Sequence, residues 1–261
     1  MELVMLAFLG AAAGLLAGLT GLAGGIVIVP ALTWIYGTQA LHGAIVVSWF
    51  CVFSNSLGAA VRQWTDRCPE QRRALLLSTR WYLLGAALVS GVAAFCAGDY
   101  RSSVTPPLVG VLQLGLVAAL LLPAAAERRR RRLPAGDLAL GAVVGGLSTV
   151  TGTGGASYTI AYLVCAAGVQ LRDAIAAATL VGTTIGGLAV IGYLLSLGML
   201  ADAGEPLWCG PMPAVGLMAL VAGGMVTASC GVRVGQRVST RLLRHLITAS
   251  LGLSAVRLVL S

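Results

Sequence analysis

Charged side chains are scarce in this chain, and lysine is missing altogether. Only 10% of the 261 residues are charged and 58% are hydrophobic, whereas about a quarter of the residues in a soluble domain carry a charge. The nine acidic residues lie at the ends of long apolar stretches or between them, never in the middle of one. This distribution is typical of a protein that crosses a lipid bilayer several times, and it argues against a soluble enzyme.

Residues that commonly carry catalysis or hold metals are also few and scattered. The two histidines, His42 and His245, both lie at the ends of apolar stretches. Six cysteines show no C-x-x-C spacing: Cys51, Cys68, Cys96, Cys165, Cys209 and Cys230. A nucleophile with its base, or a set of metal ligands, needs several such groups close together. We therefore predict no enzyme activity, no disulfide, no metal site and no cofactor.

Long apolar stretches make up most of the chain. Eight of them lie at approximately 3–36, 40–61, 81–98, 104–126, 137–169, 174–200, 207–232 and 245–261. About 20 helical residues cross the roughly 30 Å hydrocarbon core of a bilayer, so the first and fifth stretches are too long for one straight helix. Both carry glycines, which tolerate the backbone angles of a break: Gly21, Gly24 and Gly25, and Gly152, Gly154 and Gly155. We expect each stretch to break there, as a re-entrant hairpin or as two short crossings.

The two glycine clusters lie 131 residues apart, half the length of the chain. Overlaid at that offset, the surrounding sequences match at Gly14/Gly145, Leu16/Leu147, Thr20/Thr151, Gly21/Gly152, Gly24/Gly155 and Leu32/Leu163; after a slip of one residue, Ala44/Ala174 and Ile45/Ile175 also agree. Chance matching among Gly, Ala and Leu is the alternative explanation. The offset favours an internal duplication, with repeats at 1–130 and 131–261. The predicted fold is an all-α polytopic membrane protein with two pseudo-symmetric repeats of four hydrophobic segments each (4+4), the first of each broken or re-entrant.

The arginines indicate how the two repeats are inserted. If the broken stretches each cross the membrane once, the arginines divide eleven to six between the two sides. If each stretch returns to its starting side, fifteen lie on one side and two on the other. Because positive residues stay cytoplasmic, we predict oppositely oriented repeats, both termini outside and a cytoplasmic loop containing Arg128 to Arg132. Flanking apolar segments argue against reading that basic run as a nucleic-acid site.

A helix that restarts inside the membrane presents free backbone amides at its N-terminus, with about half a positive charge from the helix dipole. Two such starts, near Gly24 and Gly155, would converge on one anion. Hydroxyl and amide side chains nearby can donate hydrogen bonds without a fixed charge. The predicted substrate-binding residues are Thr20, Gly21, Gly24, Gly25, Ser54, Asn55, Thr151, Gly152, Thr153, Gly154, Gly155, Ser157 and Thr183.

Other roles for these residues stay open at this point. Serine and threonine in membrane helices often bond to their own backbone, and clustered glycines also permit close helix packing. A cation or metal permease is the main rival function, although such carriers usually place acidic residues in the middle of the membrane. Arg172 and Asp173 open the sixth stretch, where they could pair with each other or guide an anion; we favour the pair.

The two glycine motifs resemble those of the TauE/SafE sulfite exporter family of membrane permeases. The family pattern is G-x-x-x-G-x-x-G-x-G-G-G, followed by an apolar run and a proline. The first copy has Gly14, Gly18, Gly21, Gly24, Gly25 and Pro30, with Ala23 in place of a glycine; the second has Gly145, Gly152, Gly154 and Gly155, with Thr149 and Ala156 in glycine positions and Ala161 in place of the proline.

The resemblance covers the whole chain, and it implies a permease of the bacterial cytoplasmic membrane. Members of that family are thought to move sulfite, sulfonates or related sulfur anions, mostly outward. The expected partners are therefore a small anionic substrate and the lipid bilayer, with alternating access around a site at the middle of the membrane. The sequence leaves open a proton or sodium ion as coupling ion, and the oligomeric state.

Overall fold

The computed structural model describes residues 2–22, 24–37, 40–96, 105–121, 134–202 and 214–259, and every regular element in these ranges is a helix. In chain order they are α1 (Glu2–Thr20), α2 (Gly25–Tyr36), α3 (Leu41–Thr65), α4 (Pro69–Phe95), α6 (Pro106–Leu121), α7 (Pro134–Thr151), α8 (Ala156–Ala161), the π-helical turn η3 (Tyr162–Ala166), α9 (Leu171–Asp202), α10 (Ala214–Arg237) and α11 (Thr240–Val259). The boundary expected between residues 130 and 131, the run Arg128 to Arg132, Ala23 and Cys209 lie outside the described residues.

Large apolar side chains cover the outside of this helical bundle. Phe8, Leu88 and Leu253, for example, are 75%, 67% and 77% exposed. Five of the described helices are long and apolar enough to cross a bilayer: Leu3–Thr20, Leu41–Thr65, Pro69–Phe95, Leu171–Leu195 and Val215–Arg237. Because water disfavours so much exposed apolar surface, the bundle is that of a multi-pass membrane protein. The predicted all-α membrane fold is confirmed.

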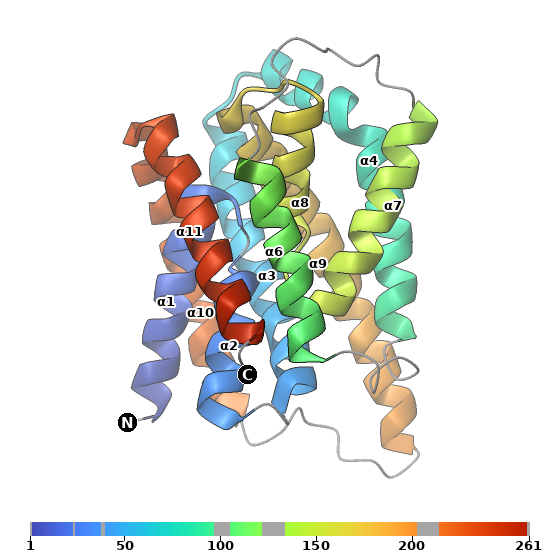
Figure 1. Ribbon diagram of the computed structural model, residues 1–261, viewed down its shortest axis with the longest axis vertical. Coiled ribbons are helices and arrows are strands. Elements are labelled where there is room, and N and C mark those ends of the chain that lie inside the picture. Colours follow the sequence, from blue (N-terminus) through green and yellow to red (C-terminus); the bar gives the residue numbers. More distant parts are fainter. Residues whose placement is uncertain are drawn as a thin grey trace.

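Both over-long stretches are interrupted, as the glycines predicted. The first becomes α1 and α2, and the fifth becomes α7 and the shorter α8, which runs on into η3. The twelve residues of α2 span about 18 Å, well short of the roughly 30 Å of a hydrocarbon core. In Figure 1, α1 rises from the lower end of the molecule and α2 descends again, while α7 descends from the upper end and α8 turns back. Each pair is therefore a hairpin inside the bundle.

Glycines with left-handed backbone angles mark equivalent places in the two hairpins. Gly21, Gly24 and Gly37 have φ angles of 74°, 81° and 85°. Their counterparts 131 residues later, Gly152, Gly155 and Gly168, have φ angles of 68°, 68° and 64°. An L-residue adopts such angles only at a cost of about 1–2 kcal/mol, so these positions need glycine.

The helices of the first half pack against those of the second. The hairpin helix α1 lies along α10, and α7 lies along α4 in the same manner. Between these two pairs, α3 and α9 cross at the centre, and α6 packs against α11 (Figure 1). Each of these contacts maps onto another, or onto itself, when α1, α3, α4 and α6 are exchanged with α7, α9, α10 and α11.

Glycines bring the backbones of the paired helices into direct contact. A Cβ atom at Gly10, Gly14 or Gly18 of α1 would overlap a carbonyl oxygen of α10. At Gly141 and Gly145 of α7, it would overlap a carbonyl oxygen of α4. Small residues at four-residue spacing are a common means of tight packing between membrane helices. These glycines hold each hairpin against a helix of the other half.

The α3–α4 turn, the start of α9 and the α10–α11 turn lie at one end of the bundle, the upper end in Figure 1. This arginine-rich end carries Arg62, Arg67, Arg72, Arg73, Arg80, Arg172, Arg233, Arg237, Arg241 and Arg244. Helix α4 extends further into it than the apolar stretch 81–98 predicted, because the charged segment from Pro69 to Arg80 is also helical. Pro69 favours this start, since the first position of a helix needs no backbone N–H.

Candidate functional site

The two helix breaks meet at the centre of the molecule. A Cβ atom at Gly25, the first residue of α2, would overlap the carbonyl oxygen of Gly152 at the end of α7. The same carbonyl accepts a hydrogen bond of 2.7 Å from Ser48 Oγ of α3. Residues 100 or more positions apart in sequence therefore form one site, with two interrupted backbones at its core.

Each break is covered by an isoleucine from the central helix of the other half. Ile175 of α9 lies against Gly21, where a Cβ atom would be 3.0 Å from its Cγ2. Ile45 of α3 lies against Gly152, where a Cβ atom would be 3.4 Å from its Cγ1. These isoleucines are the pair that matches in the overlaid sequences. The site is thus bounded by two equivalent hydrophobic contacts.

The helices that follow the breaks begin without a side-chain cap. Gly24 and Gly155 are the N-cap residues of α2 and α8, and neither has a side-chain oxygen that could accept from the first amides. The Gly24 carbonyl accepts from the amides of Val27 and Ile28, at 3.1 and 3.2 Å. The amides before them are the ones that a helix leaves without an internal partner. A helix start of this kind attracts the oxygen atoms of an anion.

Asn55 of α3 is the most conspicuous polar side chain beside the first break. It is fully buried, and neither its amide nitrogen nor its amide oxygen has a hydrogen-bond partner among the described residues. A Cβ atom at Gly24 would lie 2.8 Å from Asn55 Nδ2, and one at Gly224 would overlap Asn55 Oδ1. Leaving a buried polar group unpaired costs about 1–3 kcal/mol. The environment of Asn55 therefore favours a polar ligand or water beside Gly24.

The second break has a different lining. In place of an amide, Ile185 lies against Gly155, and a Cβ atom there would be 2.9 Å from Ile185 Cδ1 and 3.0 Å from Ser148 Oγ. The hydroxyls of Ser148 and Ser157 are buried and have no hydrogen-bond partner among the described residues. The polar groups around the two breaks are thus unequal, although the backbones are equivalent.

Most of the predicted hydroxyl residues bond to backbone or to each other. Thr20 Oγ1 donates to Leu16 O (2.6 Å), Ser54 Oγ to Cys51 O (3.1 Å), Thr151 Oγ1 to Leu147 O (2.9 Å) and Thr183 Oγ1 to Thr179 O (2.8 Å). The Thr151 and Thr153 hydroxyls lie 2.9 Å apart. The hydrogen bond to the helix backbone, an alternative considered from the sequence, is present for Thr20, Ser54, Thr151 and Thr183. The predicted residues placed directly at the breaks are Gly21, Gly24, Gly25, Asn55, Gly152, Thr153, Gly154, Gly155 and Ser157.

Trp49 and Ser90 also brace the site, and neither was among the residues singled out from the sequence. Trp49 Nε1 donates to Thr149 O at 3.3 Å, and Thr149 Oγ1 donates to Ser90 Oγ at 3.0 Å. Ser90 Oγ in turn donates to Ile185 O at 3.2 Å. These bonds tie α7 to α3, α4 and α9. Their partners come from distant parts of the chain, so no local pattern could have found them.

Two further buried polar residues lie away from the breaks. Asp137, in the first turn of α7, accepts a hydrogen bond from the Tyr162 hydroxyl and so joins the arms of the second hairpin. Its position at the end of an apolar stretch was expected, but its burial was not. Gln113 Oε1 of α6 accepts from Ser254 Oγ of α11 at 2.7 Å. From the sequence alone, Gln113 is recognisable as an amide in the middle of the apolar stretch 104–126.

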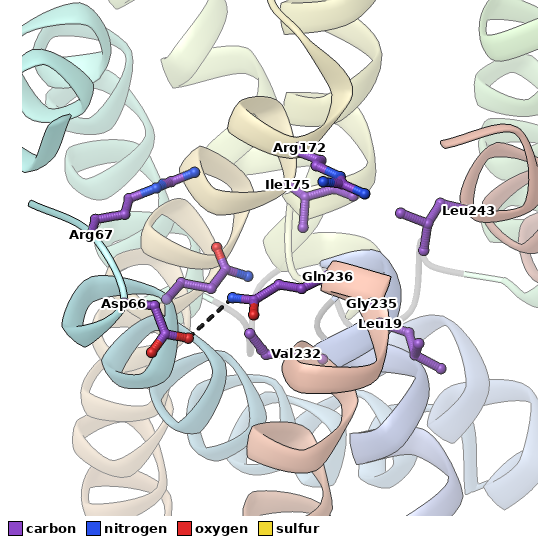
Figure 2. Close-up of a pocket in the computed structure, with 11 residues that line it drawn as sticks. Leu19, Asp66, Arg67, Arg172, Ile175, Val232, Gly235, Gln236 and Leu243 are labelled. Atoms are coloured by element: carbon purple, nitrogen blue, oxygen red, sulfur yellow. Dashed lines mark hydrogen bonds between the residues drawn. The ribbon is translucent and has the colours of Figure 1, made fainter. Parts of the chain in front are cut away.

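A cavity of about 210 Å³ opens at the arginine-rich end, directly beyond Ile175 (Figure 2). The mouth cavity, as we call it, is lined by Gly18, Leu19, Gln63, Asp66, Arg67, Arg172, Ile175, Val232, Gly235, Gln236 and Leu243.

The expected pairing of Arg172 with Asp173 is wrong, because Asp173 Oδ1 instead pairs with Arg67 Nη2 at 2.9 Å. Adjacent residues on a helix point in different directions and do not face each other.

Histidine, cysteine and acidic side chains are dispersed over the described part of the chain. There, no group of three or more His, Cys, Asp or Glu side chains is placed to hold a metal ion. The cysteines at 51, 68, 96, 165 and 230 are not joined in disulfides. The side chains around the breaks are instead small, hydroxylic, amide or aliphatic.

Comparison with known proteins agrees with this architecture. Residues 6–258 match the model of the family described as "Sulfite exporter TauE/SafE". Searches of curated proteins and of solved structures find no significant match. The match extends over nearly the whole chain, including both glycine breaks. The chain therefore belongs to the TauE/SafE sulfite exporter family of membrane transporters.

Proposed function

We propose that this transporter exports sulfite, a sulfonate or a related sulfur oxyanion across the bacterial cytoplasmic membrane, and that the anion binds where the two helix breaks meet. The observation that carries the proposal is the buried Asn55 amide, unpaired beside the uncapped start of α2. Backbone amides, the Asn55 amide and hydroxyls such as Ser157 donate to an oxyanion without a fixed charge. A neutral site of this kind binds an anion and also releases it.

The proposed mechanism is alternating access between two inverted repeats, 1–130 and 131–261. It is supported by the equivalent left-handed glycines and by helix contacts that exchange between the halves. In this mechanism Ile175 against Gly21 closes the site toward the arginine-rich end, and Ile45 against Gly152 closes it toward the other end. Moving one hairpin relative to α3 and α9 opens one contact while the other stays closed.

The proposed substrate class is tested by flux measurements on the purified protein in proteoliposomes. The solutes are sulfite, sulfate, thiosulfate and several sulfonates, with chloride and divalent metal ions for comparison. We expect flux of at least one sulfur oxyanion and none of the metal ions. Flux of metal ions alone would overturn the proposed class and support a cation permease. Loading the anion on each side separately measures the direction.

The role of Asn55 is tested by Asn55→Ala. Loss of a hydrogen bond to a charged ligand costs about 1.5–3 kcal/mol, so the KM for the transported anion should rise by at least about tenfold. Gln113→Ala is the matched control, because it removes another buried amide in the contact between α6 and α11. Equal effects of the two substitutions on KM would show that Asn55 acts on folding and not on the substrate.

A further inference from the structure

The mouth cavity lies between the arginine-rich end and the covered helix breaks. Its walls come from the end of α1, the C-terminal turns of α3 and α10, and the starts of α9 and α11. Gly18, Leu19 and Ile175 are among the residues that line it. Ile175 is also the residue that lies against Gly21. Ile175 therefore lies between the cavity and the first break.

Most of the charges around the mouth cavity are already paired. Arg67 pairs with Asp173 at 2.9 Å, and Asp66 pairs with Arg62 at 3.2 Å. Asp66 Oδ2 also accepts a hydrogen bond of 3.0 Å from Gln236 Nε2, as Figure 2 shows. The two ion pairs offset the charges of Asp66 and Arg67, which both line the cavity.

Arg172 is different, because its guanidinium faces the cavity without a carboxylate partner among the described residues. Its Nη2 donates to the carbonyl oxygen of Val238 at 3.3 Å. In Figure 2 the side chain of Arg172 passes above Ile175, on the side of the cavity opposite Asp66. One turn of α9 separates Arg172 from Ile175, so the two side chains share a helix face. In the described part of the chain, Arg172 is thus the one charged lining residue without an oppositely charged partner.

We infer that Arg172 forms a docking site for the transported oxyanion, occupied before the contact between Ile175 and Gly21 opens. This inference rests on the proposed function and adds a second anion site to it. A guanidinium presents paired N–H donors that match two oxygens of a sulfite or sulfonate group. Arg172 is exposed to solvent at the cavity, and its positive charge raises the local concentration of anions there. The Arg172 site first binds the anion that arrives from the arginine-rich side. The uncharged site at the helix breaks then receives the anion.

The test is a kinetic comparison of Arg172→Gln, Arg172→Lys and a matched control in proteoliposomes of uniform orientation. The control is Arg73→Gln, which removes an exposed arginine of α4 at the same end but outside the cavity lining. Radiolabelled sulfite is presented to the arginine-rich side and, separately, to the opposite side. For Arg172→Gln we expect the KM at the arginine-rich side to rise about tenfold, with the maximal rate changed less than twofold. Arg172→Lys should recover part of the loss, because it keeps the charge but not the paired donors.

The KM measured from each side separates a docking role of Arg172 from a structural role. A KM for Arg172→Gln equal to that of Arg73→Gln at the arginine-rich side would overturn the docking site. A loss of maximal rate on both sides without a change in KM would also overturn it, since that result indicates damage to the fold. If the wild-type protein moves no sulfur oxyanion, the proposed function itself is wrong, and the wild-type measurement alone reveals this. High salt should reduce the difference between wild type and Arg172→Gln, because ions screen the charge.

Discussion

The two N-cap glycines, Gly24 and Gly155, each combine a left-handed backbone with too little space for a side chain. Their φ angles are 81° and 68°, which a residue with a Cβ atom adopts only at a cost. An added Cβ atom would also lie within 3.0 Å of Asn55 Nδ2 at the first position and of Ile185 Cδ1 at the second. Any side chain at these positions therefore strains the backbone and fills the space where the two breaks meet.

We predict that Gly24→Leu or Gly155→Leu abolishes anion flux while the protein still inserts into the membrane. The measurement is flux per amount of inserted protein in proteoliposomes. The control is Gly168→Leu, because Gly168 has a similar φ of 64° but no atom lies within 4 Å of an added Cβ. It imposes the same backbone strain and leaves the breaks unfilled. If Gly168→Leu lost flux to the same extent, strain alone would explain the effect and the breaks would have no place in transport.

For single residues, the sequence predicted the structural roles of the glycines better than those of the hydroxyl side chains. Glycine at Gly21 or Gly24 has a role that its local backbone dictates, so the motif is readable without knowing its neighbours. A threonine such as Thr151 or Thr183 has two competing partners, a ligand and the carbonyl four residues earlier, and the nearer one takes its hydroxyl. Asn55 cannot reach such a carbonyl as readily, and its amide remains unpaired.

Among the helices, the contacts of α1 with α10 and of α7 with α4 set the position of both hairpins. Segment lengths and glycine clusters predicted where each hairpin bends, because a bilayer fixes the length of a helix that crosses it. They did not predict which helix lies beside which, since neighbours depend on surfaces far apart in the chain. The four-residue spacing of Gly10, Gly14 and Gly18 is typical of a close helix contact, but it does not identify α10 as the partner.

We predict that Gly14→Leu destabilises the protein by about 1–3 kcal/mol or more, because the added side chain overlaps the Gly224 carbonyl of α10. Thermal unfolding of the purified protein in detergent, followed by tryptophan fluorescence, measures this change. Gly252→Leu in α11 is the comparison, because it is also a helical glycine but has no atom within 4 Å of an added Cβ. We expect it to leave the unfolding temperature unchanged or to raise it. A similar loss in both variants would refute the contact between α1 and α10.

The distribution of charge over the whole molecule follows from the two hairpins. Because α2 and α8 return toward the ends where α1 and α7 began, the α3–α4 turn, the start of α9 and the α10–α11 turn share one end. The sequence predicted this gathering of arginines from counting alone, since the positive-inside rule needs only the order of crossings. The mouth cavity could not be predicted in that way, because five helices contribute to its lining.

We predict that both termini face the periplasm and that the arginine-rich end faces the cytoplasm. A C-terminal alkaline phosphatase fusion after Ser261 should be active, and a green fluorescent protein fusion at the same place should be dark. Fusions after Arg237, at the α10–α11 turn, should give the opposite pair of results. The reverse pattern at both positions would invert the orientation and place the Arg172 site on the outer face.

The glycine contact between α1 and α10 also has a consequence for biosynthesis. Roughly 200 residues separate the two helices, which the ribosome adds in about 10–40 s at about 5–20 residues per second. During that time α1 is already made, and the glycine-lined backbone that α10 will cover has no such cover. The nascent chain must therefore shelter α1, within the insertion machinery or against its own early helices, until the last quarter of the protein emerges.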